Sequence, residues 1–279
     1  MNTVVLCNFA AMTEADDLLF FDYEGNRLAY RTIGHGPVTL LAFHGFGQNG
    51  HIFSPVDEMI GHQFTILAID LFFHGSSRYA SGHLVTKSDW QRLINAFLAI
   101  KRIGRFSVTG FSLGGRFALV TAEAFADRID QVLLIAPDGI TRSKWYELAT
   151  ATRIGRGVFQ YGLHHLSTLE QAGHFLVRIG LLNRTVMRFA ELSLSTPAQR
   201  ALVYEVWTQF RLMKPDIHQV AALLNQHSVR TRFFMGAFDR IIPGAFILPL
   251  TNRLKHYELT VLNTGHNHLI GLTAERLSR

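Results

Sequence analysis

The chain has 279 residues, of which 48% are hydrophobic and 17% are charged, as in globular proteins with a sizeable buried core. Its single cysteine, Cys7, excludes an internal disulfide framework and favours a reducing compartment. No window offers the roughly 18 apolar residues of a membrane span. The apolar N-terminus also lacks the Lys or Arg that begins a signal peptide. We therefore expect a cytoplasmic protein without an integral membrane segment.

The net charge is +6, and all of the excess lies in one segment. Residues 139–215 contain 10 Lys and Arg against 4 Asp and Glu, whereas the remainder of the chain is balanced. Basic runs interleaved with aromatic residues are missing from the sequence, which argues against a nucleic-acid partner. The basic segment is therefore either a solvated surface or a means of steering an anionic substrate or interface.

Short apolar runs alternate with helical patterns through the first half of the chain. The first two runs, joined by residues 24–26, predict a β-hairpin. The later runs are nearly continuous, as in strands buried on both faces. A helix over 86–103 would begin at Thr86 or Ser88. This alternation predicts a parallel sheet with helices on both faces. The predicted strands are 18–23, 27–33, 38–43, 64–69, 106–109 and 132–136.

From about residue 140 the buried β-runs stop and only helical periodicities remain, over 145–152, 166–179, 183–194 and 197–213. Thr196 and Pro197 have the residue types of an N-cap and first helical position. We predict a helical insertion at 139–215 in a core formed by 1–138 and 216–279. The core would resume with helix 216–226, strand 229–235, a helix near 245–255, strand 257–262 and a short terminal helix.

The sequence V-T-G-F-S-L-G-G at 108–115 predicts a strand, a tight turn with Ser112 at its tip, and a helix. Gly110 and Gly114 would lie where the chain reverses, because Cβ atoms there would collide. Gly115 would let the helix pack closely against the strand. Leu113 would begin the helix with a backbone N–H that is free to bind an anion. Gly-x-Ser-x-Gly alone also fits an ordinary strand–turn–helix, so the other strand ends must decide.

Active-site residues of parallel sheets gather beyond the carboxyl ends of the strands. Asp239 and His266 follow the last two predicted strands, as Ser112 follows an earlier one. The segment 44–47 (His-Gly-Phe-Gly) follows another strand, and its flexible backbone can direct the Phe46 N–H inward. A serine nucleophile needs a base, a group that orients the base, and donors for the oxyanion. All of these stand at strand ends.

With these features in this order, the chain resembles the α/β-hydrolase fold superfamily, of the type with a helical cap. The family's Asp-x-x-x-His-Gly-x-Ser loop is matched by Asp70, His74, Gly75 and Ser77. His44 and His74 would be structural, bonding loop backbone. The resemblance implies an eight-stranded, mostly parallel sheet with helices on both faces. It also implies that the insertion is an all-helical cap, or lid.

The resemblance implies a role for each site residue. Ser112 would attack a carbonyl carbon, His266 would transfer its proton to the leaving group, and Asp239 would orient the imidazole. The N–H groups of Phe46 and Leu113 would form the oxyanion hole. Serine at this position argues against the family's dehalogenases and epoxide hydrolases, which carry a carboxylate there.

Two assignments stay open at this point. Asp138 also follows a strand end, where some family members carry the acid; otherwise it is a turn residue after Pro137. His268 could replace His266 as the base; otherwise it is a polar residue in the first turn of the last helix. The two histidines have no cysteine or carboxylate neighbour in sequence to complete a metal site. We expect neither a metal nor a cofactor.

The sequence therefore predicts a serine hydrolase that cleaves a carboxylic ester of small or medium acyl chain through an acyl-enzyme. Phe46 and Phe111 should flank the nucleophile, and Trp145 of the cap should line the same pocket, although such aromatic residues also form cap cores. The basic cap suggests an anionic substrate. Alternatives are a C–C bond hydrolase, thioesterase or peracid-forming enzyme on the same triad, or a slow-turnover ligand-binding or signalling protein. Monomer and homodimer are both compatible with the sequence.

Overall fold

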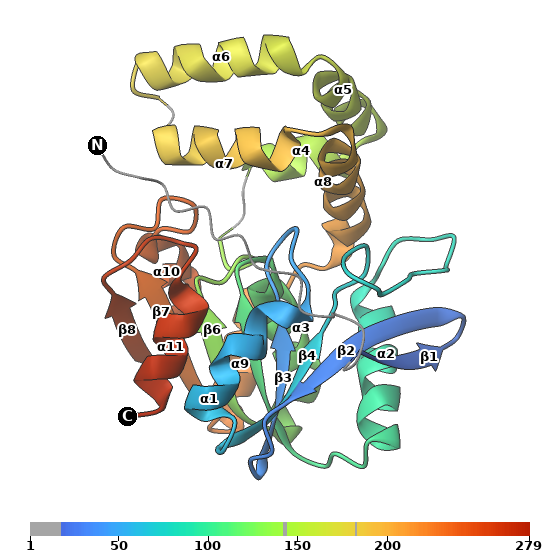
Figure 1. Ribbon diagram of the computed structural model, residues 1–279, viewed down its shortest axis with the longest axis vertical. Helices are drawn as coiled ribbons and strands as arrows, with labels where there is room; N and C mark the ends of the chain where they lie inside the picture. Colours follow the sequence, from blue (N-terminus) through green and yellow to red (C-terminus); the bar gives the residue numbers. More distant parts are fainter. Residues whose placement is uncertain (1–17, 142–143, 182) are drawn as a thin grey trace.

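The computed structural model describes residues 18–141, 144–181 and 183–279, and its centre is one eight-stranded sheet (Figure 1). The strand order is β1-β2-β4-β3-β5-β6-β7-β8. β2 runs antiparallel to both of its neighbours, whereas the strands from β4 to β8 along the sheet pair in parallel. The predicted fold class is confirmed. The strands are β1 (Leu19–Tyr23), β2 (Asn26–Ile33), β3 (Val38–Phe43), β4 (Phe64–Ile69), β5 (Phe106–Phe111), β6 (Ile129–Ile135), β7 (Arg230–Gly236) and β8 (Glu258–Leu262).

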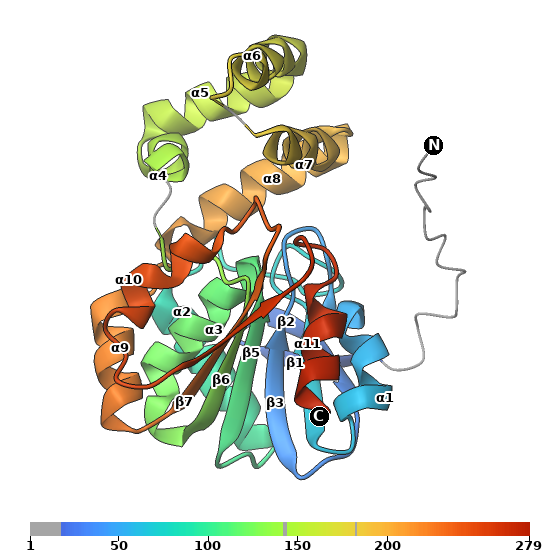
Figure 2. The same ribbon diagram turned by 90° about the vertical axis from the view of Figure 1, so that its left-hand side faces the viewer.

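Helices cover both faces of this sheet. Figure 2 shows α1 and α11 on one face and α2, α3 and α9 on the other. Interior strands such as β3 and β4 are therefore buried along most of their length, which explains their nearly continuous apolar sequences. The core helices are η1 (Gly50–Val56), α1 (Asp57–Ile60), α2 (Lys87–Ile100), α3 (Leu113–Phe125), η2 (Ala126–Arg128), α9 (Ile217–Gln226), η4 (Gly244–Ile247), α10 (Leu248–Thr251) and α11 (Leu269–Leu277).

Helix α2 shows how sequence signals become packing. Thr86 is its N-cap and forms a capping box with Asp89, which satisfies backbone donors at the helix start. The buried Trp90 lies edge-on to Phe117 of α3, with ring centroids 4.9 Å apart. Its indole Nε1–H donates to Thr121 Oγ1 at 2.9 Å, so the polar atom of this buried ring is satisfied. These contacts fix α2 against α3, the helix that begins at the predicted nucleophile.

The segment between β6 and α9 contains only helices in its described part, as predicted. Figure 2 shows them as a separate layer beyond one end of the sheet. The last turn of this segment contacts the core, because the ring centroids of Phe210 and of Phe117 in α3 are 4.8 Å apart. The exact domain boundaries at 138/139 and 215/216 stay a prediction. The cap helices are α4 (Lys144–Ala151), α5 (Arg153–His164), α6 (Leu166–Arg178), α7 (Arg184–Leu194), α8 (Pro197–Gln209) and η3 (Phe210–Leu212).

Two sequence expectations need correction. Helix α5 was not predicted, because Gly155, Gly157 and Gly162 weaken its pattern and each glycine costs about 1 kcal/mol in a helix. Thr152 caps this helix by accepting the Gly155 N–H at 2.9 Å. The helix predicted near 245–255 is wrong in length, since only η4 and the four-residue α10 form there. Pro249 lacks the N–H that one continuous helix would need.

In the described part of the chain, none of the helices combines the length and the hydropathy that a bilayer crossing requires.

Candidate active site

Ser112 lies at the turn between β5 and α3 in a strained backbone conformation, with φ 51° and ψ −117°. Three hydrogen bonds hold it there. The Ser112 N–H donates to the Ile135 carbonyl at 3.0 Å, and its own carbonyl accepts from Gly115 and Asp138, each at 2.9 Å. Non-glycine residues in such conformations cost of order 1–3 kcal/mol and persist where the surroundings enforce them. The turn therefore fixes the backbone at Ser112 between β5 and α3.

The glycines around Ser112 allow three segments of backbone to touch. A Cβ at Gly110 would overlap the Gly114 carbonyl across the turn, as predicted. A Cβ at Gly114 would meet the Phe43 carbonyl of β3, so this glycine is required by the neighbouring strand. A Cβ at Gly115 would lie 2.5 Å from the Cα of Pro137, just beyond β6. The end of β3 and the start of α3 are therefore in direct contact.

Asp239 and His266 form a buried pair at the ends of β7 and β8. The His266 Nδ1 lies 2.6 Å from Asp239 Oδ2, and the aspartate side chain is fully buried. The other oxygen, Oδ1, accepts the N–H groups of Ile241 at 2.8 Å and Ile242 at 3.0 Å. An ionised carboxylate only accepts hydrogen bonds, so Nδ1 carries the proton and Nε2 is left as an acceptor. This is the tautomer that a general base needs.

The His266 ring packs beside the nucleophile turn. Its centroid is 4.9 Å from that of Phe111, the residue before Ser112. The hydrogen bonds of the described residues include none between Ser112 and His266. Catalytic hydrogen bonds in substrate-free enzymes are often long and shorten when substrate binds. The structure thus brings Asp239 and His266 into contact and places the imidazole next to Phe111.

Two backbone N–H groups near Ser112 are available as anion donors. Within the described part of the chain, neither the Phe46 nor the Leu113 N–H donates a hydrogen bond. The Gly45 N–H, in contrast, is occupied by Gln48 Oε1 at 3.0 Å. A Cβ at Gly45 would lie 3.1 Å from the Phe111 ring, so the loop after β3 adjoins the nucleophile turn. Both donors predicted for the oxyanion hole are therefore free.

His44 anchors this loop as a neutral, fully buried histidine. Its Nδ1 lies 2.7 Å from the Gly45 carbonyl, and its Nε2 accepts the Leu71 N–H at 2.9 Å. Burial, with a further contribution from the nearby His74, lowers the pKa of His44 to about 3. Both ring nitrogens are used by backbone groups, so the expectation of a structural role agrees with the contacts.

The loop after β4 is held by Asp70 and packs against Phe46. Asp70 Oδ1 accepts the Gly50 N–H at 2.7 Å, and Oδ2 accepts the Ser76 N–H at 2.9 Å. The His74 ring lies edge-on to Phe46, with centroids 5.7 Å apart, and burial lowers the pKa of His74. Its Nε2 is buried and has no hydrogen-bond partner among residues 18–141, 144–181 and 183–279. His74 thus supports the residue that carries one predicted oxyanion donor.

Asp138 forms an ion pair with Arg116 and not with His266. Its carboxylate forms a short ion pair with Arg116, whose guanidinium also donates to Tyr146 Oη at 3.1 Å. Burial opposes the charge of Arg116, but Asp138 and Tyr146 outweigh it and raise the pKa of Arg116. Tyr146 donates in turn to the Trp207 carbonyl at 3.0 Å, so this cluster ties α3 to the cap. Sequence reasoning missed it because residues 22 to 30 positions apart carry no shared motif.

Of the remaining predicted site residues, His268 is an exposed N-cap of α11. The side chain of Trp145 lies outside the described residues, so its predicted place in the pocket stays a prediction. Groups of three or more His, Cys, Asp or Glu that could hold a metal are not found among the residues that the structure describes.

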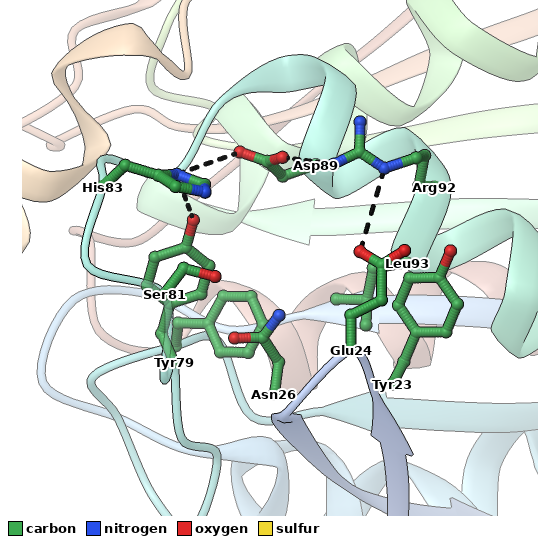
Figure 3. A pocket seen from close by; sticks show the side chains of 10 residues that line it. Tyr23, Glu24, Asn26, Tyr79, Ser81, His83, Asp89, Arg92 and Leu93 are labelled. Carbon is green, nitrogen blue, oxygen red and sulfur yellow. Dashed lines mark hydrogen bonds and ion pairs between the residues drawn. The ribbon is translucent and has the colours of Figure 1, made fainter.

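A separate small pocket lies between the β1–β2 turn and α2 (Figure 3). Figure 3 shows His83 and Arg92 directed at Asp89, with Arg92 also reaching Glu24. This pocket contains none of the residues of the candidate active site.

Comparisons with known proteins agree on one family. The sequence profile described as alpha/beta hydrolase fold matches residues 38–270. An uncharacterised protein of Mycobacterium tuberculosis is 31% identical over 125 residues, which are 45% of this chain and 36% of that protein. The chain therefore spans little more than a third of that relative. A pimeloyl-[acyl-carrier protein] methyl ester esterase of Xanthomonas campestris is 28% identical over 86% of this chain and 91% of its own length. The crystal structure of a hydrolase from Pseudomonas aeruginosa superimposes with a TM-score of 0.65 at 18% identity, covering 95% of this chain and 96% of that one.

Proposed function

The chain belongs to the alpha/beta hydrolase fold family, and on this premise we propose that it hydrolyses a carboxylic ester through an acyl-enzyme. The observation that carries the proposal is the buried contact of 2.6 Å between His266 Nδ1 and Asp239 Oδ2, next to the strained turn at Ser112. A histidine oriented by a buried carboxylate beside an activated serine is the arrangement that acyl transfer requires.

The first step assigned to these residues is attack of Ser112 Oγ on the ester carbonyl. His266 Nε2 takes the hydroxyl proton as the bond to carbon forms, and Asp239 balances the resulting imidazolium. The proton then passes to the leaving alcohol. In the second half of the reaction His266 deprotonates water, which attacks the acyl-enzyme and releases the acid and Ser112. His266, with its proton on Nδ1, is therefore the base in both acylation and deacylation.

The negative charge of the tetrahedral intermediate needs donors that are in place beforehand. The N–H groups of Phe46 and Leu113 donate no hydrogen bond to the described residues, and Leu113 adds the positive end of the α3 dipole. Removal of one such donor typically raises the barrier by about 3 kcal/mol. The Asp70 and His74 contacts keep the first donor in position without touching substrate.

The substrate class is proposed from the cap and from one relative's name. Arg211 of η3 lies beside Arg156 of α5. Burial lowers the pKa of Arg211, and the positive charge of Arg156 lowers it further. Within the described residues neither arginine has an acidic partner. Because the neighbouring Phe210 packs on α3, these charges lie where the cap meets the core. Together with the name of the Xanthomonas esterase, they support a methyl or other small alkyl ester of an acyl group that bears an anion.

The test uses chromogenic and methyl esters of graded acyl length, each in a neutral form and a form with a terminal carboxylate. Ser112→Ala should lose roughly six orders of magnitude in turnover, the loss seen when such a nucleophile is removed. Ser107→Ala is the matched control, because Ser107 lies in β5, the strand that leads to Ser112, and its buried hydroxyl has no hydrogen-bond partner among the described residues. Comparable activity of the two variants would refute the proposal. If acidic and neutral esters are hydrolysed at equal rates and salt does not change these rates, the preference for an anionic substrate is refuted, whereas the ester hydrolysis itself is not.

A further inference from the structure

Helix α5 carries an exposed apolar stripe on the side opposite its contact with α8. Ile154, Val158 and Tyr161 are exposed, and their spacing places them on one face. On the opposite face the Phe159 ring stacks on Trp207 of α8, with centroids 5.2 Å apart. The inner face of α5 is therefore packed, whereas its outer face is apolar and open.

Helix α6 repeats this arrangement. Gly173 faces Met187 of α7, whose Sδ lies 2.6 Å from the position of an added Cβ. Phe175 and Ile179 lie on the other side of the helix and are exposed. Both views show α6 on the far side of α7 from the sheet (Figures 1 and 2). The outer cap face is defined here by Ile154, Val158, Tyr161, Phe175 and Ile179.

The charges along the outer cap face are of one sign. Arg153 and Arg178 are exposed at the edges of the two stripes. The sequence of α5 contains no Asp or Glu, and the single acid of α6 is Glu170, on the side toward α7. Apolar stripes flanked by arginine are the features of a helix that lies in a membrane interface. Large exposed apolar patches are uncommon on monomeric proteins without a binding role.

We propose that the outer cap face docks onto an anionic lipid bilayer, with α5 and α6 lying in the plane of the headgroups. Charge complementarity selects this occupant. Residues 139–215 have a net charge of +6, and anionic lipids attract basic surfaces. Two copies joined through this face would bring like charges together. The proposal concerns binding alone and does not depend on the proposed hydrolase reaction.

The test is flotation of the full chain with vesicles of phosphatidylcholine alone or containing phosphatidylglycerol. We expect binding to the anionic vesicles that weakens as salt increases. The double variant Val158→Glu/Phe175→Glu should bind at least about tenfold less, because it replaces inserted apolar groups by acids that the surface repels. Val261→Glu is the matched control, since Val261 is 60% exposed on β8 and Val158 is 66% exposed. Thermal unfolding checks that each variant is folded.

Four results would overturn the proposal. The first is that the wild-type protein does not bind the anionic vesicles. The second is equal binding to neutral vesicles, because charge would then not select the surface. The third is equal binding by the double variant and wild type. The last is a dimer of the wild-type chain that the double variant dissociates, with no vesicle binding, because the face would then be a contact between copies.

Discussion

Replacement of Asp239 by asparagine tests the acid assignment most sharply. The amide oxygen of the new side chain can keep the two hydrogen bonds from the Ile241 and Ile242 N–H groups at 2.8 and 3.0 Å. The amide NH₂ then faces His266 Nδ1, which becomes an acceptor and leaves the proton on Nε2. In this tautomer the imidazole cannot take the Ser112 proton. We expect about a 10⁴-fold loss of turnover, or about 5 kcal/mol in the barrier, with the fold retained.

The matched substitution is Asp138→Asn, at the other acid that follows a strand end. Its carboxylate binds Arg116 and the Gly139 N–H, so the variant should lose roughly 1–3 kcal/mol of stability but less than about tenfold in turnover. Initial rates with one chromogenic ester and urea unfolding of both variants measure the two effects. The assignment fails if Asp138→Asn is the slower enzyme, or if Asp239→Asn keeps more than about a hundredth of wild-type turnover.

Two further predictions concern stability. The pKa of His44 is about 3 in the folded protein, whereas an unfolded histidine titrates near 6.5. Its contribution is therefore complete above pH 6.5 and declines by up to about 1.4 kcal/mol per pH unit as the pH falls toward 3. Urea unfolding of His44→Gln at about pH 7 and pH 5 should show a shallower decline than wild type. An unchanged decline, or an equal effect of the exposed His256→Gln, contradicts this. Gly114→Ala should cost more than about 2 kcal/mol because the methyl group overlaps the Phe43 carbonyl. Gly271→Ala meets no atom within 4 Å in α11 and should be neutral or stabilising. Similar midpoints for the two alanine variants would refute the packing argument.

Sequence reasoning was most reliable where a local rule decides the structure. The nearly continuous apolar run at 38–43 coincides with β3, because a strand covered on both faces favours apolar side chains along most of its length. Thr196 and Pro197 begin α8 as predicted, since capping depends on neighbours within one turn. Helix α5 was missed because contacts with α8, distant in sequence, outweigh its glycines.

The candidate site divides in the same way. Strand ends predicted that Asp239 and His266 would approach each other, and the structure joins them by one short contact. The sequence left Asp138 as a rival acid, because both aspartates follow strands. In the structure the Asp138 carboxylate pairs with the Arg116 guanidinium, 22 residues away in the chain, and not with His266. Pairing of buried charges is a three-dimensional property and leaves no local pattern.

The sequence by itself determined the order of the strands and of most helices, the position of the serine turn and the excess of positive charge in residues 139–215. Each of these follows from neighbouring residues, through periodicity, capping and glycine geometry. Only the tertiary structure decided which acid faces the histidine, which backbone donors remain free, and that Phe175 turns outward on α6 while Gly173 turns inward. These outcomes depend on what packs against each group, and burial is settled only when distant segments meet.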